Sequence, residues 1–136
     1  MRINLFPGKA FPAWFLVNQG ADYPKMIDAV YILKSRGPQE ESLLEILKMV
    51  TNRTRYEPGC LQSGVWKDGE NEEMMVFEVW RSKADFERHV KSPLYRHFLA
   101  AIEMSSEEPK ISISECEDVR GIEMIEEAMT KKESII

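Results

Sequence analysis

The sequence is poor in cysteine, since Cys60 and Cys116 are the only two among its 136 residues. Two cysteines are too few for a disulfide scaffold, so we expect a protein of the reducing cytoplasm. No Cys-x-x-Cys spacing or adjacent base gives either residue a redox role, and both are interpreted as structural. No apolar run approaches the roughly 20 residues that a membrane-spanning helix requires, so no membrane partner is expected.

Positive charge is also in short supply. Lysine and arginine total 18 against 23 aspartates and glutamates, which leaves a net charge of −5. Nucleic-acid binding needs a clustered basic surface, and the sequence contains no such cluster. We therefore expect no nucleic-acid partner.

Motifs for metals and nucleotides are missing as well. The two histidines, His89 and His97, have no cysteine or acid at metal-ligand spacing, which argues against zinc and iron sites. The chain lacks both the glycine-rich loop that cradles phosphate and the dinucleotide fingerprint. The expected site therefore uses neither a metal nor another cofactor.

What the sequence does contain is a clear order of periodic segments. Alternating apolar residues predict strands, and apolar residues at helical spacing predict helices. The strands are expected at residues 26–34, 61–67, 74–81 and 111–116. The helices are expected at residues 38–56, around 86–90, at 94–102 and at 117–132.

This order predicts an α+β domain with the ferredoxin-like β-α-β-β-α-β arrangement and an antiparallel sheet. The expected parts are an N-terminal arm at 1–25, the domain at 26–116, and a C-terminal helix and tail at 117–136. Helices would cover one face of the sheet. The other face would expose apolar side chains, so we expect a homodimer that packs sheet against sheet.

Strand alternation places Val76, Glu78 and Trp80 on one face of the sheet. A carboxylate on a buried face needs a partner or a raised pKa. Glu78 is therefore interpreted either as a general base or as half of a structural ion pair with a helix. His89 is the best proton-handling candidate, because imidazole titrates near neutral pH. Its structural alternative is a hydrogen bond to the sheet edge or to Glu78.

Three short motifs follow one another in the middle of the chain. They are E-P-G-C at Glu57–Cys60, E-x-W at Glu78 and Trp80, and H-x-x-S-P at His89, Ser92 and Pro93. Together with the aromatic residues Phe86 and Tyr95, this set resembles the antibiotic biosynthesis monooxygenase (ABM) family over residues 26–116. The resemblance implies a dimeric ferredoxin-like α+β barrel.

For function, the resemblance implies a cofactor-independent monooxygenase that acts on a small, electron-rich, quinol-like substrate. The site residues would be His89 and Glu78 for proton transfer, with the substrate held by Trp80, Tyr95, Phe86 and Tyr31. The resemblance is weaker for two branches of the family. The haem-degrading branch has its iron-binding histidine where Leu99 stands, and the polyketide-oxidising branch has asparagine and tyrosine where Val76 and Phe86 stand.

Two alternatives stay open at the level of the sequence. One is a different small-molecule enzyme, such as an isomerase, that uses the same acid–base pair. The other is a non-catalytic dimeric binding or stress-response module, in which Glu78 and His89 make a structural contact and the aromatic side chains fill the pocket.

Overall fold

The computed structural model describes residues 25–35, 37–70, 72–117 and 120–131. The arm predicted for residues 1–25 lies outside the described residues, except for residue 25. The described residues between 25 and 117 form one compact unit. The described residues 120–131 belong to a second unit.

The first unit follows the predicted order of strands and helices. Its elements are β1 (Met26–Lys34), α2 (Gln39–Thr54), β2 (Cys60–Asp68), β3 (Glu73–Trp80), α3 (Lys83–Val90), α4 (Pro93–Ile102) and β4 (Lys110–Cys116). The break between α3 and α4 falls at Ser92 and Pro93, because Ser92 caps α4 and Pro93 fits its first turn.

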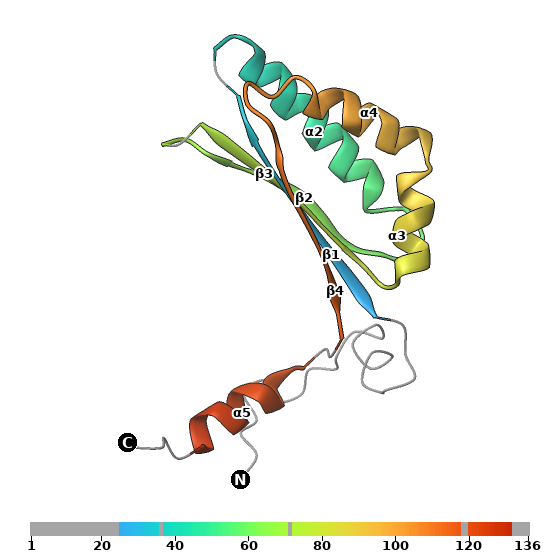
Figure 1. The fold of residues 1–136 in the computed structure, drawn as a ribbon, viewed down its shortest axis with the longest axis vertical. Coiled ribbons are helices and arrows are strands. Elements are labelled where there is room, and N and C mark those ends of the chain that lie inside the picture. The colour runs from blue at the N-terminus through green and yellow to red at the C-terminus, as the bar shows by residue number, and fades with distance from the viewer. Residues whose placement is uncertain (1–24, 36, 71, 118–119, 132–136) are drawn as a thin grey trace. The chain divides into compact units, whose positions relative to one another are not determined.

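The four strands form one antiparallel sheet in the order β2-β3-β1-β4 (Figure 1). In the middle of the sheet, β1 pairs with β3 through Ile27 and Trp80, and with β4 through Tyr31 and Ile111. This interleaved order is that of the ferredoxin-like fold, and it confirms the predicted α+β class.

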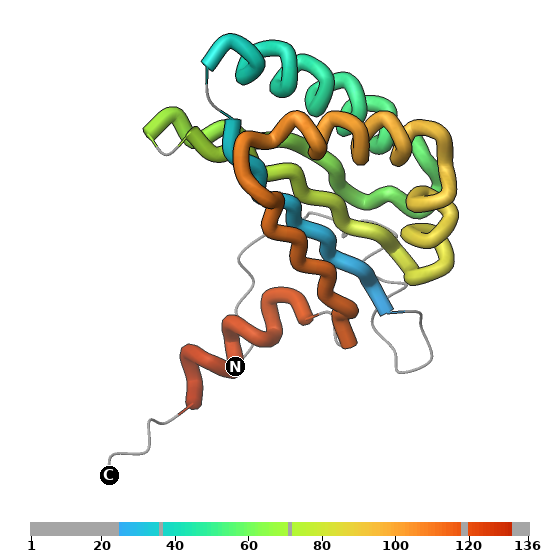
Figure 2. The backbone as a smooth tube through the Cα atoms, turned by 45° about the horizontal axis from the view of Figure 1, so that its top comes forward, coloured from blue at the N-terminus to red at the C-terminus, as the bar shows by residue number. Residues whose placement is uncertain are grey.

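Helices α2, α3 and α4 lie on one face of the sheet, as both views of the backbone show (Figures 1 and 2). In α2, Leu43, Leu47 and Val50 recur at helical spacing and are buried. They meet a sheet whose facing side chains include Tyr31 and Val76, both fully buried. Burial of this apolar layer is the main force that holds helices and sheet together.

The predicted alternation along β3 is confirmed. Val76, Glu78 and Trp80 face the helices and are at most 3% exposed, whereas Met75 on the opposite face is 38% exposed. That opposite face, called here the outer face of the sheet, carries partly exposed apolar side chains. They are Val30, Ile32, Trp66, Met75, Phe77 and Val79.

The second unit contributes helix α5 (Ile122–Thr130) to the described residues. It is shorter than the predicted helix of residues 117–132. Two residues of its predicted apolar face, Ile125 and Met129, are 51% and 67% exposed. Within the part of the chain that is described, no helix is long and apolar enough to cross a membrane.

Candidate functional site

Three segments that are distant in the sequence meet around His89. Glu78 and Trp80 lie at the end of β3, and His89 lies in the last turn of α3. Glu57 comes from the link between α2 and β2. Helix α3 starts directly after β3 because Ser82 caps it by accepting a hydrogen bond from the Asp85 N–H at 3.2 Å.

The imidazole of His89 lies between two carboxylates. Its Nδ1 makes a hydrogen bond with Oε2 of Glu57, and its Nε2 lies 3.3 Å from Oε2 of Glu78. Trp80 stacks on the imidazole with ring centroids 4.5 Å apart, and its Nε1–H donates to Oε2 of Glu78 at 2.8 Å. The contact between Glu78 and His89 that the sequence suggested is thus present, and Glu57 is a second partner.

Burial and charge act in opposite directions on His89, which is 2% exposed. Burial alone lowers its pKa, because desolvation disfavours the imidazolium. The carboxylates of Glu78 and Glu57 outweigh this effect, so the pKa of His89 lies above its ordinary value of 6.5. His89 is therefore a proton acceptor that is stronger than a free imidazole.

A pocket of about 180 Å³ lies beside this cluster. The residues that border it include Glu57, Trp80, Asp85, Arg88, His89 and Ser92. The side chain of Glu57 is 23% exposed, whereas that of Glu78 is 3% exposed and does not border the pocket. A small molecule in the pocket can therefore contact Glu57, whereas the ring of Trp80 is 0% exposed and is covered.

The other predicted aromatic residues lie in the core and do not border this pocket. Tyr31 and Tyr95 hydrogen-bond to each other, with 3.0 Å between their hydroxyl oxygens. Tyr95 packs edge-on against His89 at 5.1 Å between centroids, and Phe86 packs against the core. Burial, and then the charge of Glu78, raise the pKa of Tyr31 and of Tyr95. Both hydroxyls are therefore protonated at neutral pH.

Cys60 lies close to Glu78 and Glu57, and its thiol is unreactive. Burial, followed by the charges of Glu78 and Glu57, raises the pKa of its thiol to about 12. Only the thiolate is nucleophilic, so this thiol is unreactive at neutral pH. The environment supports the structural interpretation of Cys60.

A second polar cluster, centred on Asp85, was missed from the sequence. Its carboxylate accepts hydrogen bonds from Ser82 Oγ at 2.8 Å, from Arg81 Nη2 at 3.2 Å and from Arg88 Nη2. Burial of Asp85 acts to raise its pKa, but these donors hold the pKa below the ordinary value. The available signal was the capping pattern Ser-x-x-Asp at the start of α3.

Glu57 was also missed as a site residue, since it was interpreted only as part of a fold motif. It lies 32 residues before His89 and in a segment without periodicity. Strand or helix patterns relate residues within one element, so none of them pairs these two. The pairing follows from the fold alone.

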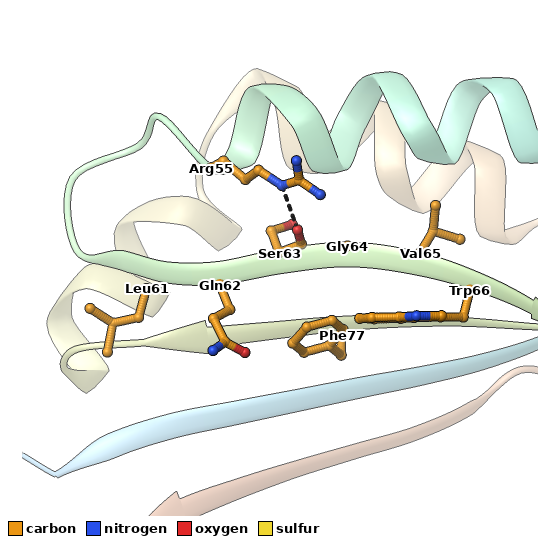
Figure 3. Close-up of a pocket in the computed structure, with 8 residues that line it drawn as sticks. All are labelled: Arg55, Leu61, Gln62, Ser63, Gly64, Val65, Trp66 and Phe77. Carbon is orange, nitrogen blue, oxygen red and sulfur yellow. Dashed lines mark hydrogen bonds between the residues drawn. The ribbon is translucent and has the colours of Figure 1, made fainter. Parts of the chain in front are cut away.

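A larger hollow, of about 610 Å³, lies along β2 and is drawn in Figure 3. Arg55 borders it and donates from Nε to the carbonyl of Ser63 at 2.7 Å. Trp66 and Phe77 pack together nearby, with centroids 4.4 Å apart. This hollow has no acid–base pair on its wall, so the smaller pocket beside His89 is the candidate site.

Raising the pH is expected to destabilise the domain through His89. Because its pKa is raised in the folded state, the stabilisation is complete below pH 6.5 and is lost as the pH rises through the folded-state pKa. The free energy of unfolding in urea should fall by up to about 1.4 kcal/mol per pH unit in that window. His89→Gln should remove this slope, and an unchanged slope in that variant would argue against the assignment.

The sheet order and the helices on one face define a ferredoxin-like α+β domain with a small pocket against its buried acid–base cluster. The chain belongs to the antibiotic biosynthesis monooxygenase family, whose model matches residues 26–101. The resemblance inferred from the motifs is thereby confirmed.

Solved structures share this fold. A conserved protein of unknown function from Bacteroides thetaiotaomicron is 20% identical, with a TM-score of 0.62 that covers 67% of this chain and 97% of that one. A proposed antibiotic biosynthesis monooxygenase from Caulobacter crescentus is 20% identical, with a TM-score of 0.61 over 69% and 92% of the two chains.

One curated relative, an uncharacterized protein of Synechocystis, is 27% identical over 82 residues, or 60% of this chain. The chain spans about half the length of that relative, 54%.

Proposed function

We propose that this protein is a cofactor-independent monooxygenase that acts on a small, electron-rich, quinol-like substrate. The observation that carries the proposal is the environment of the His89 imidazole. The ring lies between two carboxylates, stacks on Trp80 and borders a pocket. Family membership supports the same class of reaction.

In the proposed reaction, the hydroxyl of the quinol gives its proton to the Glu57–His89 pair. Glu57 borders the pocket, and its carboxylate contacts Nδ1 of His89. The proton passes through Glu57 to the imidazole, and Glu78 stabilises the imidazolium that forms. The 3% exposure of Glu78 favours this stabilising role over that of the base that meets substrate.

The quinolate that remains is electron-rich enough to reduce O₂ directly. Electron transfer and recombination form a carbon–oxygen bond, which gives a peroxide. The imidazolium of His89 returns its proton to the peroxide, and loss of water then leaves one oxygen atom in the oxidised product and places the other in water. Dioxygen is the oxidant and the substrate supplies all the electrons, so the reaction balances.

The size of the pocket supports a substrate with one ring. Its volume of about 180 Å³ is close to that of the roughly 150 Å³ engineered protein cavity that binds benzene. Trp80 is fully buried and supports the imidazole beside the pocket by stacking on it. In this proposal Tyr31, Tyr95 and Phe86 act by packing the imidazole and the core.

The test is oxygen uptake with a panel of one-ring and multi-ring quinols, measured on metal-free protein with an oxygen electrode. We expect uptake above the spontaneous rate for at least one of the one-ring compounds, with water formed and no hydrogen peroxide released. A panel that gives only the spontaneous rate would contradict the proposal.

A second candidate function is a non-catalytic binding module. It is favoured by the hydrogen bond from Trp80 to Glu78 and by the contact from Glu78 to His89, which together hold the cluster in one arrangement. Ligand-dependent thermal stabilisation without oxygen uptake would support this candidate over the enzyme.

We also propose that two copies of the chain pack through the outer faces of their sheets. Met75 on this face is 38% exposed, and Trp66 is 51% exposed. Burial of apolar surface of this kind drives association.

Met75→Glu is expected to separate the proposed dimer into monomers of 15.8 kDa in sedimentation velocity. A buried charge at the centre of an apolar interface should weaken association by at least about 100-fold. Leu99→Glu, on α4 and 44% exposed, is the matched control and should leave the assembly unchanged. A monomeric wild-type protein would refute the proposed dimer.

A further inference from the structure

The position of Glu57 depends on a short turn that follows α2. The turn is closed by a hydrogen bond from the Cys60 N–H to the Glu57 carbonyl at 3.1 Å. Its start is tied to α2 by the bond from the Glu57 N–H to the Thr54 carbonyl at 3.0 Å. These backbone bonds set the path of the turn, but they leave open what holds it against α3.

Gly59 is the point at which the turn touches α3. A Cβ atom placed on Gly59 would lie 2.2 Å from Cγ of Asp85 and 2.4 Å from its Oδ2. The bare backbone of Gly59 therefore rests directly on the carboxyl group of Asp85. Its carbonyl also accepts a hydrogen bond from the Arg81 N–H at 2.8 Å.

Asp85 is a firm support for this contact. It is 4% exposed, and its carboxylate is held by Ser82, Arg81 and Arg88. Arg81 links the turn to Asp85, because its backbone N–H donates to the Gly59 carbonyl and its guanidinium donates to the Asp85 carboxylate. The carboxyl group of Asp85 therefore contacts three segments, which are the turn, the end of β3 and the first turn of α3.

Asp85 and His89 are four residues apart on α3, and the turn contacts both of them. Asp85 contacts the backbone of the turn at Gly59, and His89 makes a hydrogen bond with the carboxylate of Glu57. Residues four apart lie on the same face of a helix. One face of α3 therefore holds the turn at two points.

We propose that Asp85 is a positioning residue that holds Glu57 against His89 by supporting Gly59. This inference rests on the proposed function, because it gives Asp85 a part in the same acid–base pair. The titratable groups that face His89 from other elements are Glu57, Glu78 of β3 and Tyr95 of α4. Asp85 makes no hydrogen bond or ion pair with His89, so its influence passes through the turn.

The test is a double-mutant cycle read out by the titration of His89 in NMR spectra. The chain has only two histidines, and the exposed His97 is an internal reference. Asp85→Ala should lower the pKa of His89 by on the order of one unit, because the turn loses its support and Glu57 moves away. Glu57→Gln should lower it by at least as much. The double variant should show no further fall.

Asp85→Asn is a second variant that can be measured if Asp85→Ala does not fold. It keeps the shape under Gly59 but weakens the contacts with Arg81 and Arg88, so we expect a smaller fall in the pKa of His89. If Asp85→Ala lowers the pKa of His89 as much in the Glu57→Gln background as in the wild type, Asp85 acts by its own charge. That result would overturn the proposal. An unchanged pKa in both Asp85 variants would overturn it too.

The titration needs no turnover, so this proposal and the proposed function can fail separately. If no quinol is oxidised and the cycle is still non-additive, Asp85 positions the pair and the reaction is a different one. If uptake is found, Asp85→Ala should lower kcat by a larger factor with Glu57 present than in the Glu57→Gln background.

Discussion

Replacing His89 with glutamine is expected to slow quinol-dependent oxygen uptake by at least about 100-fold, the usual size of a general acid–base contribution. Glutamine is similar in size and can donate to one of the two carboxylates, but it cannot accept a proton. The comparison is made with initial rates in an oxygen electrode at saturating quinol and fixed pH.

Two matched variants sharpen this test. Glu57→Gln should slow oxygen uptake as much as His89→Gln does, because no carboxylate then accepts the proton of the substrate. His97→Gln changes an exposed histidine on α4 and should leave the rate unaltered. Equal rates in the wild type, His89→Gln and Glu57→Gln would remove the pair from the mechanism.

Glu78 is expected to change the pH dependence of the rate more than its maximum. The neutral form of His89 accepts the proton, so activity should rise as the pH rises through its raised pKa. Glu78→Gln removes a carboxylate that raises this pKa, and the rising limb should move to lower pH. Activity and stability therefore change in opposite directions with pH, since the imidazolium stabilises the fold but cannot act as the base.

The fold was predictable because its signals are local. The alternation in β1 and the stripe of Leu43, Leu47 and Val50 in α2 each lie within one element, and the structure has both where the pattern places them. The burial of Glu78 between Val76 and Trp80 followed from the two-residue period of β3.

The site was less predictable because its contacts join different elements. The sequence pointed to His89, Glu78 and Trp80, which do meet, but gave no reason to bring Glu57 to the same imidazole. Tyr31 and Tyr95 were expected near a substrate, and they bond to each other in the core instead of bordering the pocket. Which aromatic residues reach a pocket depends on packing between helices and sheet, and periodicity contains no information about that.

Gly59→Ala is expected to lower the free energy of unfolding by roughly 2–5 kcal/mol, the sum of two separate costs. The first is the backbone, because φ of Gly59 is 83° and an L-residue there loses about 1–2 kcal/mol. The second is the methyl group, which would lie 2.2 Å from Cγ of the firmly held Asp85. Overpacking of this kind costs about 1–3 kcal/mol.

Gly37→Ala separates the two costs. Gly37 also has a positive φ, of 76°, but nothing lies within 4 Å of an added Cβ, so only the backbone cost of about 1–2 kcal/mol should remain. Urea unfolding, followed by tryptophan fluorescence, measures both variants. Gly59→Ala combined with Asp85→Ala should be less destabilised than the sum of the two single changes, because the methyl group then occupies the space of the lost carboxyl. Equal losses for Gly59→Ala and Gly37→Ala would show that the turn yields to the methyl group, and Asp85 could then not hold Glu57 in place.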